Sequence, residues 1–274
     1  MILIGPYIGN FEQEVLTFRP YAKWLLDILE YDIAYVSTHS NRAFMYEDFI
    51  SSNFIIPIFD DLSRDELGQE GYIHKNISQK DYQILLRNVK DIIIEKEGCN
   101  KRDIEVYSLS YVKSTPPLSI YNKRFLPIEH SEIDVADYVK KIVFIPDRSA
   151  SGSILRLIRD YLDVNKNDYI IIGDQKTRFT RENVVLNLVD YFENGWKYMV
   201  QIISKAKAVI CPLSYWTTIC NLQNVPVFSW GENVGQHRPG GVYHFGNSKC
   251  LAFPFSGNKE VLIKMLDSFI RELK

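Results

Sequence analysis

Three hydroxyl side chains, Ser214, Thr217 and Thr218, lie at the junction of two predicted elements. The apolar run at residues 208–211 is typical of a parallel strand buried on both faces, and Ser214 is a favourable N-cap for a helix over residues 215–222. A helix that begins after such a strand directs free backbone N–H groups and the positive end of its dipole at an anion. The hydroxyls could add donors to a diphosphate, although an ordinary capped helix of an α/β domain would show the same pattern.

A second group of candidates lies in the loop after the first predicted strand, residues 2–4. Gly9 and Asn10 belong to a glycine-containing loop, and such loops let a ligand approach the backbone closely. Glu12 and Glu14 follow at the start of a predicted helix. Either carboxylate could face a ligand, or both could be ordinary acids of a first helical turn that complement the helix dipole. The residues alone leave both interpretations open.

Four further side chains stand in loops that follow predicted strands. Arg148 could hold a phosphate with its bidentate fork, or it could be a surface arginine. Asp174 could bond a ribose hydroxyl, or it could be an ordinary turn aspartate. His237 and Arg238 lie in the polar, glycine-rich segment 231–241, which has the composition of a loop that covers a ligand. They could reach a phosphate or a leaving group, or belong to an ordered surface loop.

Apolar periodicity predicts alternating strands and helices in both halves of the chain. In the first half the predicted strands cover residues 2–4, 32–37, 53–59 and 104–109, and the predicted helices cover 11–29 and 78–97. In the second half the predicted strands cover 141–146, 169–172, 184–188, 208–211 and 225–230, and the predicted helices cover 151–162, 195–206, 215–222 and 259–273. Residues 111–140 lose this periodicity and contain three prolines, which is typical of a linker.

Alternating strands and helices predict an α/β fold with parallel sheets and right-handed crossovers. We therefore expect two Rossmann-like domains, residues 1–139 and 140–274, whose sheets face each other across a cleft. The final helix could belong to the second domain or pack back on the first. Ligands of such sheets bind at the carboxyl ends of the strands, where the candidate loops fall.

The second half resembles the donor-binding domain of heptosyltransferase-like glycosyltransferases of the GT-B fold. The residues that match the family pattern are Ile203, Ala206, Ile210, Ser214, Pro226 and Gly231. The sequence departs from the pattern at Tyr215, where the family often has glycine, and at Thr218, where it often has histidine. The first loop resembles the family's G-x-x-G-E-F-G-W-E-L segment through Gly5, Gly9, Asn10, Phe11, Glu12, Gln13, Glu14 and Val15.

This resemblance implies an inverting, metal-independent transferase that uses a nucleotide-diphosphate sugar and no other cofactor. The second domain would hold the donor through Ser214, Thr217, Thr218 and Arg148, and the loop residues Gly9, Asn10, Asp174, His237 and Arg238 are further candidates for donor binding. Glu14 is the best match to the family's general base, and Glu12 is the second. The acceptor would be a glycan, such as a lipopolysaccharide core, or a hydroxymethylated DNA base, as in phage-type members.

The composition excludes several other classes. The chain has 274 residues with 32 Lys+Arg against 34 Asp+Glu, so its net charge of −2 argues against general electrostatic capture of nucleic acid. Four scattered cysteines without CxxC spacing, and the absence of a signal peptide, lead us to expect a cytoplasmic protein. No apolar run approaches the roughly 18 residues of a membrane span. The five histidines lack metal-ligand spacing, and no P-loop or GxGxxG motif is present.

Two other functions remain open at this level. A nucleotide-sugar epimerase of the same architecture would eliminate the nucleotide and would need several acid–base groups. A non-catalytic nucleotide-sugar binding protein would bind the donor and tolerate the loss of Glu14. The sequence does not distinguish these from a transferase, and it does not indicate the oligomeric state.

Overall fold

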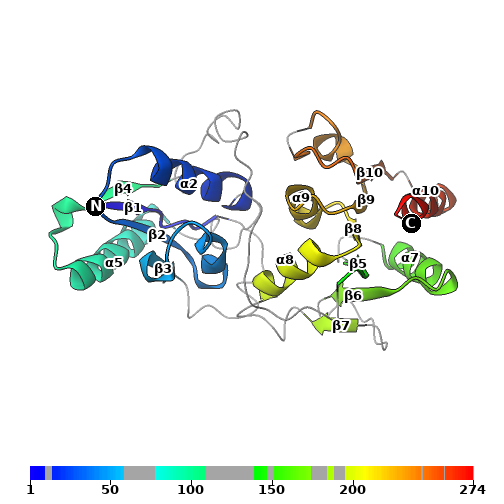
Figure 1. The fold of residues 1–274 in the computed structure, drawn as a ribbon, viewed down its shortest axis with the longest axis horizontal. Coiled ribbons are helices and arrows are strands. Elements are labelled where there is room, and N and C mark those ends of the chain that lie inside the picture. The colour runs from blue at the N-terminus through cyan, green and yellow to red at the C-terminus, as the bar shows by residue number, and fades with distance from the viewer. Residues whose placement is uncertain are drawn as a thin grey trace. The chain divides into compact units, whose positions relative to one another are not determined.

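The computed structural model describes residues 1–9, 14–58, 78–108, 139–146, 151–173, 184–187, 195–241, 243–255 and 257–273. The chain forms two compact units, Met1–His130 and Ser131–Lys274 (Figure 1). The division follows residue 130, whereas the sequence indicates a boundary after residue 139. Within the described ranges, no helix is long and apolar enough to cross a membrane.

Unit 1 is built on a four-stranded parallel sheet with the order β3-β2-β1-β4. Its strands are β1 (Ile2–Ile4), β2 (Ala34–His39), β3 (Ile55–Ile58) and β4 (Glu105–Tyr107). The central strand β1 pairs with β2 and β4, so that Ile4 lies opposite both Val36 and Tyr107. The chain runs outward from β1 to β3 and then crosses to the other side of β1, which makes the β1/β4 position the topological switch point.

Helices cover both sides of this sheet. They are the π-helix η1 (Glu14–Phe18), which continues directly into α2 (Arg19–Ile28), the short 3₁₀ helices η2 (Ser40–Tyr46), η3 (Ser52–Phe54) and η4 (Lys101–Asp103), and α5 (Gln79–Glu97). Figure 1 shows α2 and α5 on opposite sides of the strands. Val89 and Ile93 of α5 are buried against Leu3 and Tyr35 of the sheet, so one part of the core of unit 1 lies between α5 and the strands.

Unit 2 contains a six-stranded parallel sheet with the order β10-β9-β8-β5-β6-β7. The strands are β5 (Ile142–Phe144), β6 (Tyr169–Gly173), β7 (Val184–Asn187), β8 (Ala208–Pro212), β9 (Val227–Gly231) and β10 (Cys250–Pro254). Counted from β5, this is the order of the doubly wound dinucleotide-binding fold, whose switch point lies between its first and fourth strands, here β5 and β8. Five of these strands were predicted from the sequence, and β10 was not.

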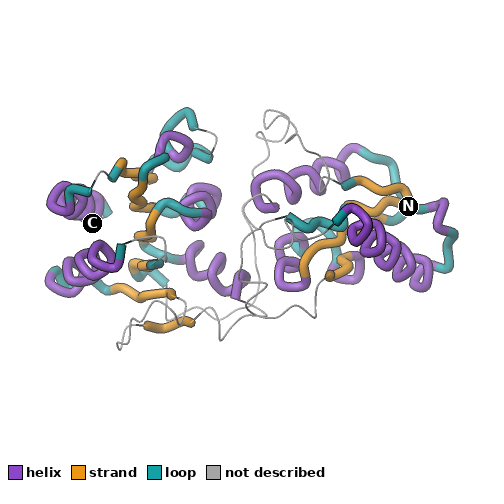
Figure 2. The backbone as a smooth tube through the Cα atoms, turned by 180° about the vertical axis from the view of Figure 1, so that it is seen from behind, coloured by secondary structure: helices purple, strands orange, loops and turns teal. Residues whose placement is uncertain are grey.

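The helices of unit 2 lie on both faces of its sheet. They are α7 (Gly152–Val164), α8 (Gly195–Lys205), α9 (Tyr215–Leu222) and α10 (Lys259–Glu272), with the 3₁₀ helix η7 (Val234–His237) between β9 and β10. Figures 1 and 2 show α7 and α10 on one face and α8 and α9 on the other. Leu262, Leu266 and Phe269 of α10 join the core of unit 2, so the final helix packs on the sheet of its own unit.

Candidate functional site

The turn after β8 lies at the switch point of the unit 2 sheet, where ligands of doubly wound folds bind. Ser214 is half-buried and caps α9, because its Oγ accepts a hydrogen bond from the Trp216 amide at 3.3 Å. The Leu213 amide donates to the Trp230 carbonyl at 2.9 Å, which fastens the turn to the end of β9. The predicted N-cap and the predicted bounds of this helix are confirmed.

Thr217 supports this turn from inside the protein. The residue is fully buried, and its Oγ1 accepts from the Ser214 amide at 3.3 Å and lies 2.8 Å from the Ser229 hydroxyl of β9. The sulfur of Cys211 lies 3.7 Å from the same oxygen. Thr218 is fully buried as well. Of the three hydroxyl residues that the sequence indicates for a diphosphate, the structure thus places Ser214 at the surface of the turn and both threonines in the interior.

His237 and Arg238 lie beside the edge strand β10. The thiol of Cys250, the first residue of β10, donates to the His237 carbonyl at 3.5 Å, and Arg238 Nε donates to the Ala252 carbonyl at 3.1 Å. These contacts fall along the first part of β10, whereas Ser214 follows the carboxyl end of β8. The predicted ligand-covering loop therefore covers a sheet edge, and the contact of its two residues with a donor remains a prediction.

Four of the predicted site residues fall outside the described ranges. They are Asn10, Glu12, Arg148 and Asp174. Arg148 follows β5 in the sequence and Asp174 follows β6, so the roles proposed for them rest on their positions in the chain.

The loop after β1 is held against the two neighbouring strands. The Gly5 amide donates to the Tyr107 carbonyl at 2.7 Å, and the Tyr7 amide donates to the Ser37 carbonyl at 2.9 Å. Gly5 has φ of +112°, and a Cβ there would come within 2.4 Å of the Ser37 carbonyl oxygen, so only glycine fits. A Cβ on Gly9 would lie 2.2 Å from the Tyr7 hydroxyl. The predicted glycine loop therefore exists and its described part is buried, but atoms of Ser37 and Tyr7 occupy the space beside Gly5 and Gly9 that was predicted to admit a ligand.

Glu14 is the first residue of the π-helix η1. The sequence had instead predicted a single α-helix over residues 11–29. π-Helical turns are uncommon and occur frequently at functional sites. The Glu14 side chain is fully buried. Its Oε1 accepts from the Thr38 hydroxyl and, at 2.8 Å, from the Tyr46 hydroxyl, while its Oε2 accepts from Arg42 Nη1 at 3.0 Å. Glu14 is thus the centre of a buried polar cluster, defined as Glu14, Thr38, Arg42 and Tyr46.

Burial dominates the electrostatics of this cluster. It raises the pKa of Glu14, and the charge of Arg42 and the hydrogen bonds from Thr38, Tyr46 and Arg42 oppose that rise. Burial, and next the charge of Glu14, also raise the pKa of Tyr46 well above its usual value, so this phenol stays protonated and can donate. A carboxylate with a raised pKa is a stronger base than a free one, which is the property that general-base catalysis near neutral pH requires.

A second buried arginine holds η2 in place. Arg19 is fully buried at the start of α2; its Nε donates to the Met45 carbonyl at 2.6 Å and its Nη2 pairs with Asp48 at 2.5 Å. Its guanidinium also lies over the ring of Phe49, 5.5 Å from the centroid. The helix that carries Arg42 and Tyr46 is therefore tied to α2 independently of Glu14.

Thr38 and Arg42 are not among the residues predicted for the site from the sequence. The available signal was their position, because Thr38 belongs to the strand next to β1 and Arg42 follows the carboxyl end of that strand. In a parallel sheet the carboxyl ends of adjacent strands meet at one edge, so residues there can converge on the loop after β1.

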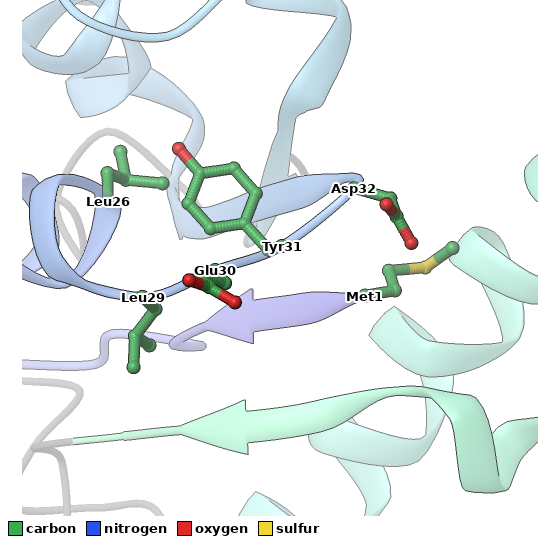
Figure 3. Close-up of a pocket in the computed structure, with 6 residues that line it drawn as sticks. All are labelled: Met1, Leu26, Leu29, Glu30, Tyr31 and Asp32. Carbon is green, nitrogen blue, oxygen red and sulfur yellow. The ribbon is translucent and has the colours of Figure 1, made fainter.

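Figure 3 shows a pocket in unit 1 at the opposite ends of the strands from Glu14. Its lining residues are Met1, Leu26, Leu29, Glu30, Tyr31 and Asp32. Met1 precedes β1 and Asp32 precedes β2, so the pocket lies at the amino ends of the strands. It is therefore separate from Glu14 and from the loop after β1.

The sequence matches no known protein-family model and no curated protein. Several solved structures are similar to the chain over its whole length, including the following two. A glycosyl transferase family 9 structure from Veillonella parvula covers 99% of this chain and 97% of its own, with 11% identity and a TM-score of 0.63. The E. coli heptosyltransferase WaaC with ADP covers 100% and 99%, with 10% identity and a TM-score of 0.54. The likeness extends over both units, and it shows that the chain has the two-domain Rossmann-like fold of GT-B glycosyltransferases.

Proposed function

We propose that this protein transfers a sugar from a nucleotide-diphosphate donor to an acceptor hydroxyl, with inversion and without a metal ion. The observation that carries the proposal is the Ser214 turn, a half-buried hydroxyl and helix N-terminus at the switch point of a doubly wound sheet. This position suits a diphosphate, because the positive end of the helix dipole favours negative charge there. The GT-B fold supports the same reading, since the WaaC structure of that fold contains ADP.

In the proposed reaction the acceptor oxygen attacks the anomeric carbon from the face opposite the diphosphate. The bond between that carbon and the phosphate oxygen breaks, and the nucleoside diphosphate leaves with the electron pair. The N-terminus of α9 stabilises the charge on the departing diphosphate. Glu14 accepts the proton of the acceptor hydroxyl, and its burial supports this role by raising its pKa. Glu12 is the second candidate for the base.

The donor site is tested by thermal unfolding in the presence of nucleotides. The protein is screened against UDP, GDP, ADP and CMP and their sugars, in parallel with Ser214→Ala and Arg148→Ala. We expect one nucleotide to raise the melting temperature by several degrees in the wild type only, because binding to the native state stabilises it. Ser78→Ala is the matched control, since Ser78 caps α5 in unit 1 through the Asp81 amide. No shift with any nucleotide at millimolar concentration would contradict the proposal.

The base is tested by replacing each acid with its amide. With a donor and acceptor that the wild type uses, Glu14→Gln is expected to lower kcat by about 10²–10⁴-fold, the usual contribution of a general base. Glu12→Gln is expected to keep most of the activity. If Glu12→Gln is the inactive variant, the base is Glu12, and Glu14 serves only to hold the first loop.

A non-catalytic nucleotide-sugar binding protein is the second candidate function. The burial of Glu14 favours it, because both carboxylate oxygens already accept hydrogen bonds inside unit 1. A binding protein would show the same nucleotide-dependent melting temperature as a transferase. It would release no nucleoside diphosphate from the sugar donor, and Glu14→Gln would leave its donor affinity unchanged.

The acceptor is a glycan or a hydroxymethylated DNA base in this proposal. The salt dependence of acceptor binding distinguishes the two. Binding to DNA phosphates weakens steeply as salt concentration rises, because counterions are released, whereas binding to a neutral glycan does not. The balanced charge of the chain favours the glycan.

A further inference from the structure

Arg42 joins the two ends of the segment that carries both candidate bases. Its side chain is 6% exposed, and a single nitrogen, Nη1, donates to the Gly9 carbonyl at 2.8 Å and to Glu14 Oε2 at 3.0 Å. Gly9 is the last described residue before Glu12 in the chain, and Glu14 is the first described residue after it. One guanidinium group from η2 therefore bonds both the first loop, at Gly9, and the first residue of η1, Glu14.

We propose that Arg42 is a positioning residue for the catalytic base, because it fixes the Glu14 carboxylate against the first loop and places a positive charge directly beside it. This inference rests on the proposed function, since it requires Glu14 to accept the proton of the acceptor. Arg42 would not touch the substrate, and its effect on the rate would pass through Glu14.

Among the groups around Glu14, Arg42 has the largest opposing effect on the burial-raised pKa of the carboxyl group. Among the described residues, Glu14 is faced by Arg42 and Tyr46 of η2, by Thr38 of β2 and by Tyr7 of the first loop. Both tyrosines have a pKa raised well above the usual value by burial and then by Glu14, so both are neutral. Arg42 is the largest of the influences that lower the pKa of Glu14 against its burial.

Two other titratable groups lie close to the buried cluster. Burial, and next the charge of Arg42, lower the pKa of His39 well below its usual value, so this imidazole is neutral. Arg19 acts on Tyr46 and pairs with Asp48, which balances its charge. Neither group replaces the charge of Arg42 next to Glu14.

Removal of that charge should raise the pKa of Glu14 further. An opposite charge at this distance moves the pKa of a carboxyl group by about 1–3 units, so Arg42→Gln should raise the pKa of Glu14 by that amount. Arg42→Lys retains the charge and should restore most of the wild-type behaviour. Arg19→Gln is the control for weaker packing of η2, because it removes a buried guanidinium that ties η2 to α2 and pairs with Asp48.

The experiment has two arms. In the first, ¹³C NMR of glutamate-labelled protein follows the Glu14 carboxyl group from pH 4 to 9 in the wild type, Arg42→Gln, Arg42→Lys and Arg19→Gln, with Glu14→Gln identifying the resonance. In the second, the acidic limb of the kcat/KM profile is recorded for the same variants. The first arm needs no substrate, so it tests the action of Arg42 even if the proposed function fails.

We expect the Glu14 titration and the acidic limb to move upward together by about 1–3 pH units in Arg42→Gln, and to stay near their wild-type values in Arg42→Lys and Arg19→Gln. A purely structural role for Arg42 would lower stability or kcat at every pH without moving the limb, and that result would overturn the inference. So would a Glu14 titration that moves while the limb does not, because Glu14 would then not be the base. A wild type that turns over no donor would refute the proposed function only.

Discussion

Gly231, at the end of β9, lies directly against Leu213 in the turn before α9. A Cβ on Gly231 would come within 2.8 Å of the Leu213 Cβ, so the turn can pack on the strand end only when this residue is glycine. The Leu213 amide bonds to Trp230, the neighbour of Gly231, at 2.9 Å. The close approach of strand end and turn sets the position of Ser214, which is the central residue of the proposed donor site.

Gly231→Ala should displace the turn and weaken donor binding. The added methyl group meets the side chain of Leu213, and overpacking of this kind costs about 1–3 kcal/mol. We expect a lower melting temperature and a loss of the nucleotide-dependent shift. Gly235→Ala is the control in the same loop, because no heavy atom lies within 4 Å of a Cβ built there. Equal effects of the two substitutions would show that the contact with Leu213 does not set the turn.

Thr217→Val should destabilise unit 2 more than Thr217→Ser. Valine removes the oxygen that accepts from the Ser214 amide and that lies 2.8 Å from the Ser229 hydroxyl. Leaving buried polar groups without a partner costs about 1–3 kcal/mol. Serine retains the hydroxyl and loses one methyl group. Urea denaturation of the three proteins measures the difference, and a Val variant as stable as the Ser variant would mean that the hydroxyl contributes nothing.

His237 should make the protein less stable in acid. The residue is 6% exposed, and burial lowers its pKa to about 4 from the ordinary value of 6.5. The unfolded chain therefore binds the proton more readily, and stability falls as pH drops from about 6.5 toward 4, by on the order of 2–3 kcal/mol. His237→Phe keeps an aromatic ring beside Tyr243, whose centroid lies 5.1 Å away, and removes the titration.

The measurement is the free energy of unfolding at pH 7 and pH 4.5 for wild type and His237→Phe. We expect the acid-induced loss to be smaller in the variant. The difference between the two proteins isolates His237 from His39, whose pKa is also lowered by burial. An identical loss in both proteins would show that His237 does not carry the effect.

The contribution of Glu14 to stability should depend on pH in the opposite sense. Its pKa is raised in the folded state, so the folded protein binds the proton more readily than the unfolded chain does. The stability that it contributes is fully present below the unfolded pKa, near 4.3, and is lost as pH rises through the folded pKa. As pH rises, the unfolding free energy of the wild type should therefore shift downward relative to that of Glu14→Gln. An upward shift would mean that Arg42 and the hydrogen bonds outweigh burial.

Local signals predicted most of the fold. The helix predicted over residues 78–97 is α5, Gln79–Glu97, because Ser78 accepts from the Asp81 amide at its start and Gly98 ends it in the left-handed region, with φ of 64°. The two parallel sheets followed from the alternation of strands and helices. Each of these features depends on residues within a few positions of one another.

The features that the sequence analysis missed depend on distant residues. β10 is an edge strand in a region rich in polar and glycine residues, and its pairing with β9 joins segments on either side of an 18-residue connection (residues 232–249). The interior location of Thr217 depends on Ser229 in the next strand. The pairing of Glu14 with Arg42 spans 28 residues and requires β1 and β2 to be adjacent, which no spacing in the sequence reveals.

The measurement that tests the account most directly is turnover. Wild type, Ser214→Ala and Glu14→Gln are incubated with the nucleotide sugar identified by thermal unfolding, together with glycans or hydroxymethylated DNA, and released nucleoside diphosphate and sugar-bearing acceptor are quantified together. We expect the wild type to form both in equal amounts, Glu14→Gln to bind the donor with little turnover, and Ser214→Ala to bind it weakly. A wild type that binds the donor but forms neither product with any acceptor would contradict sugar transfer and leave a binding protein.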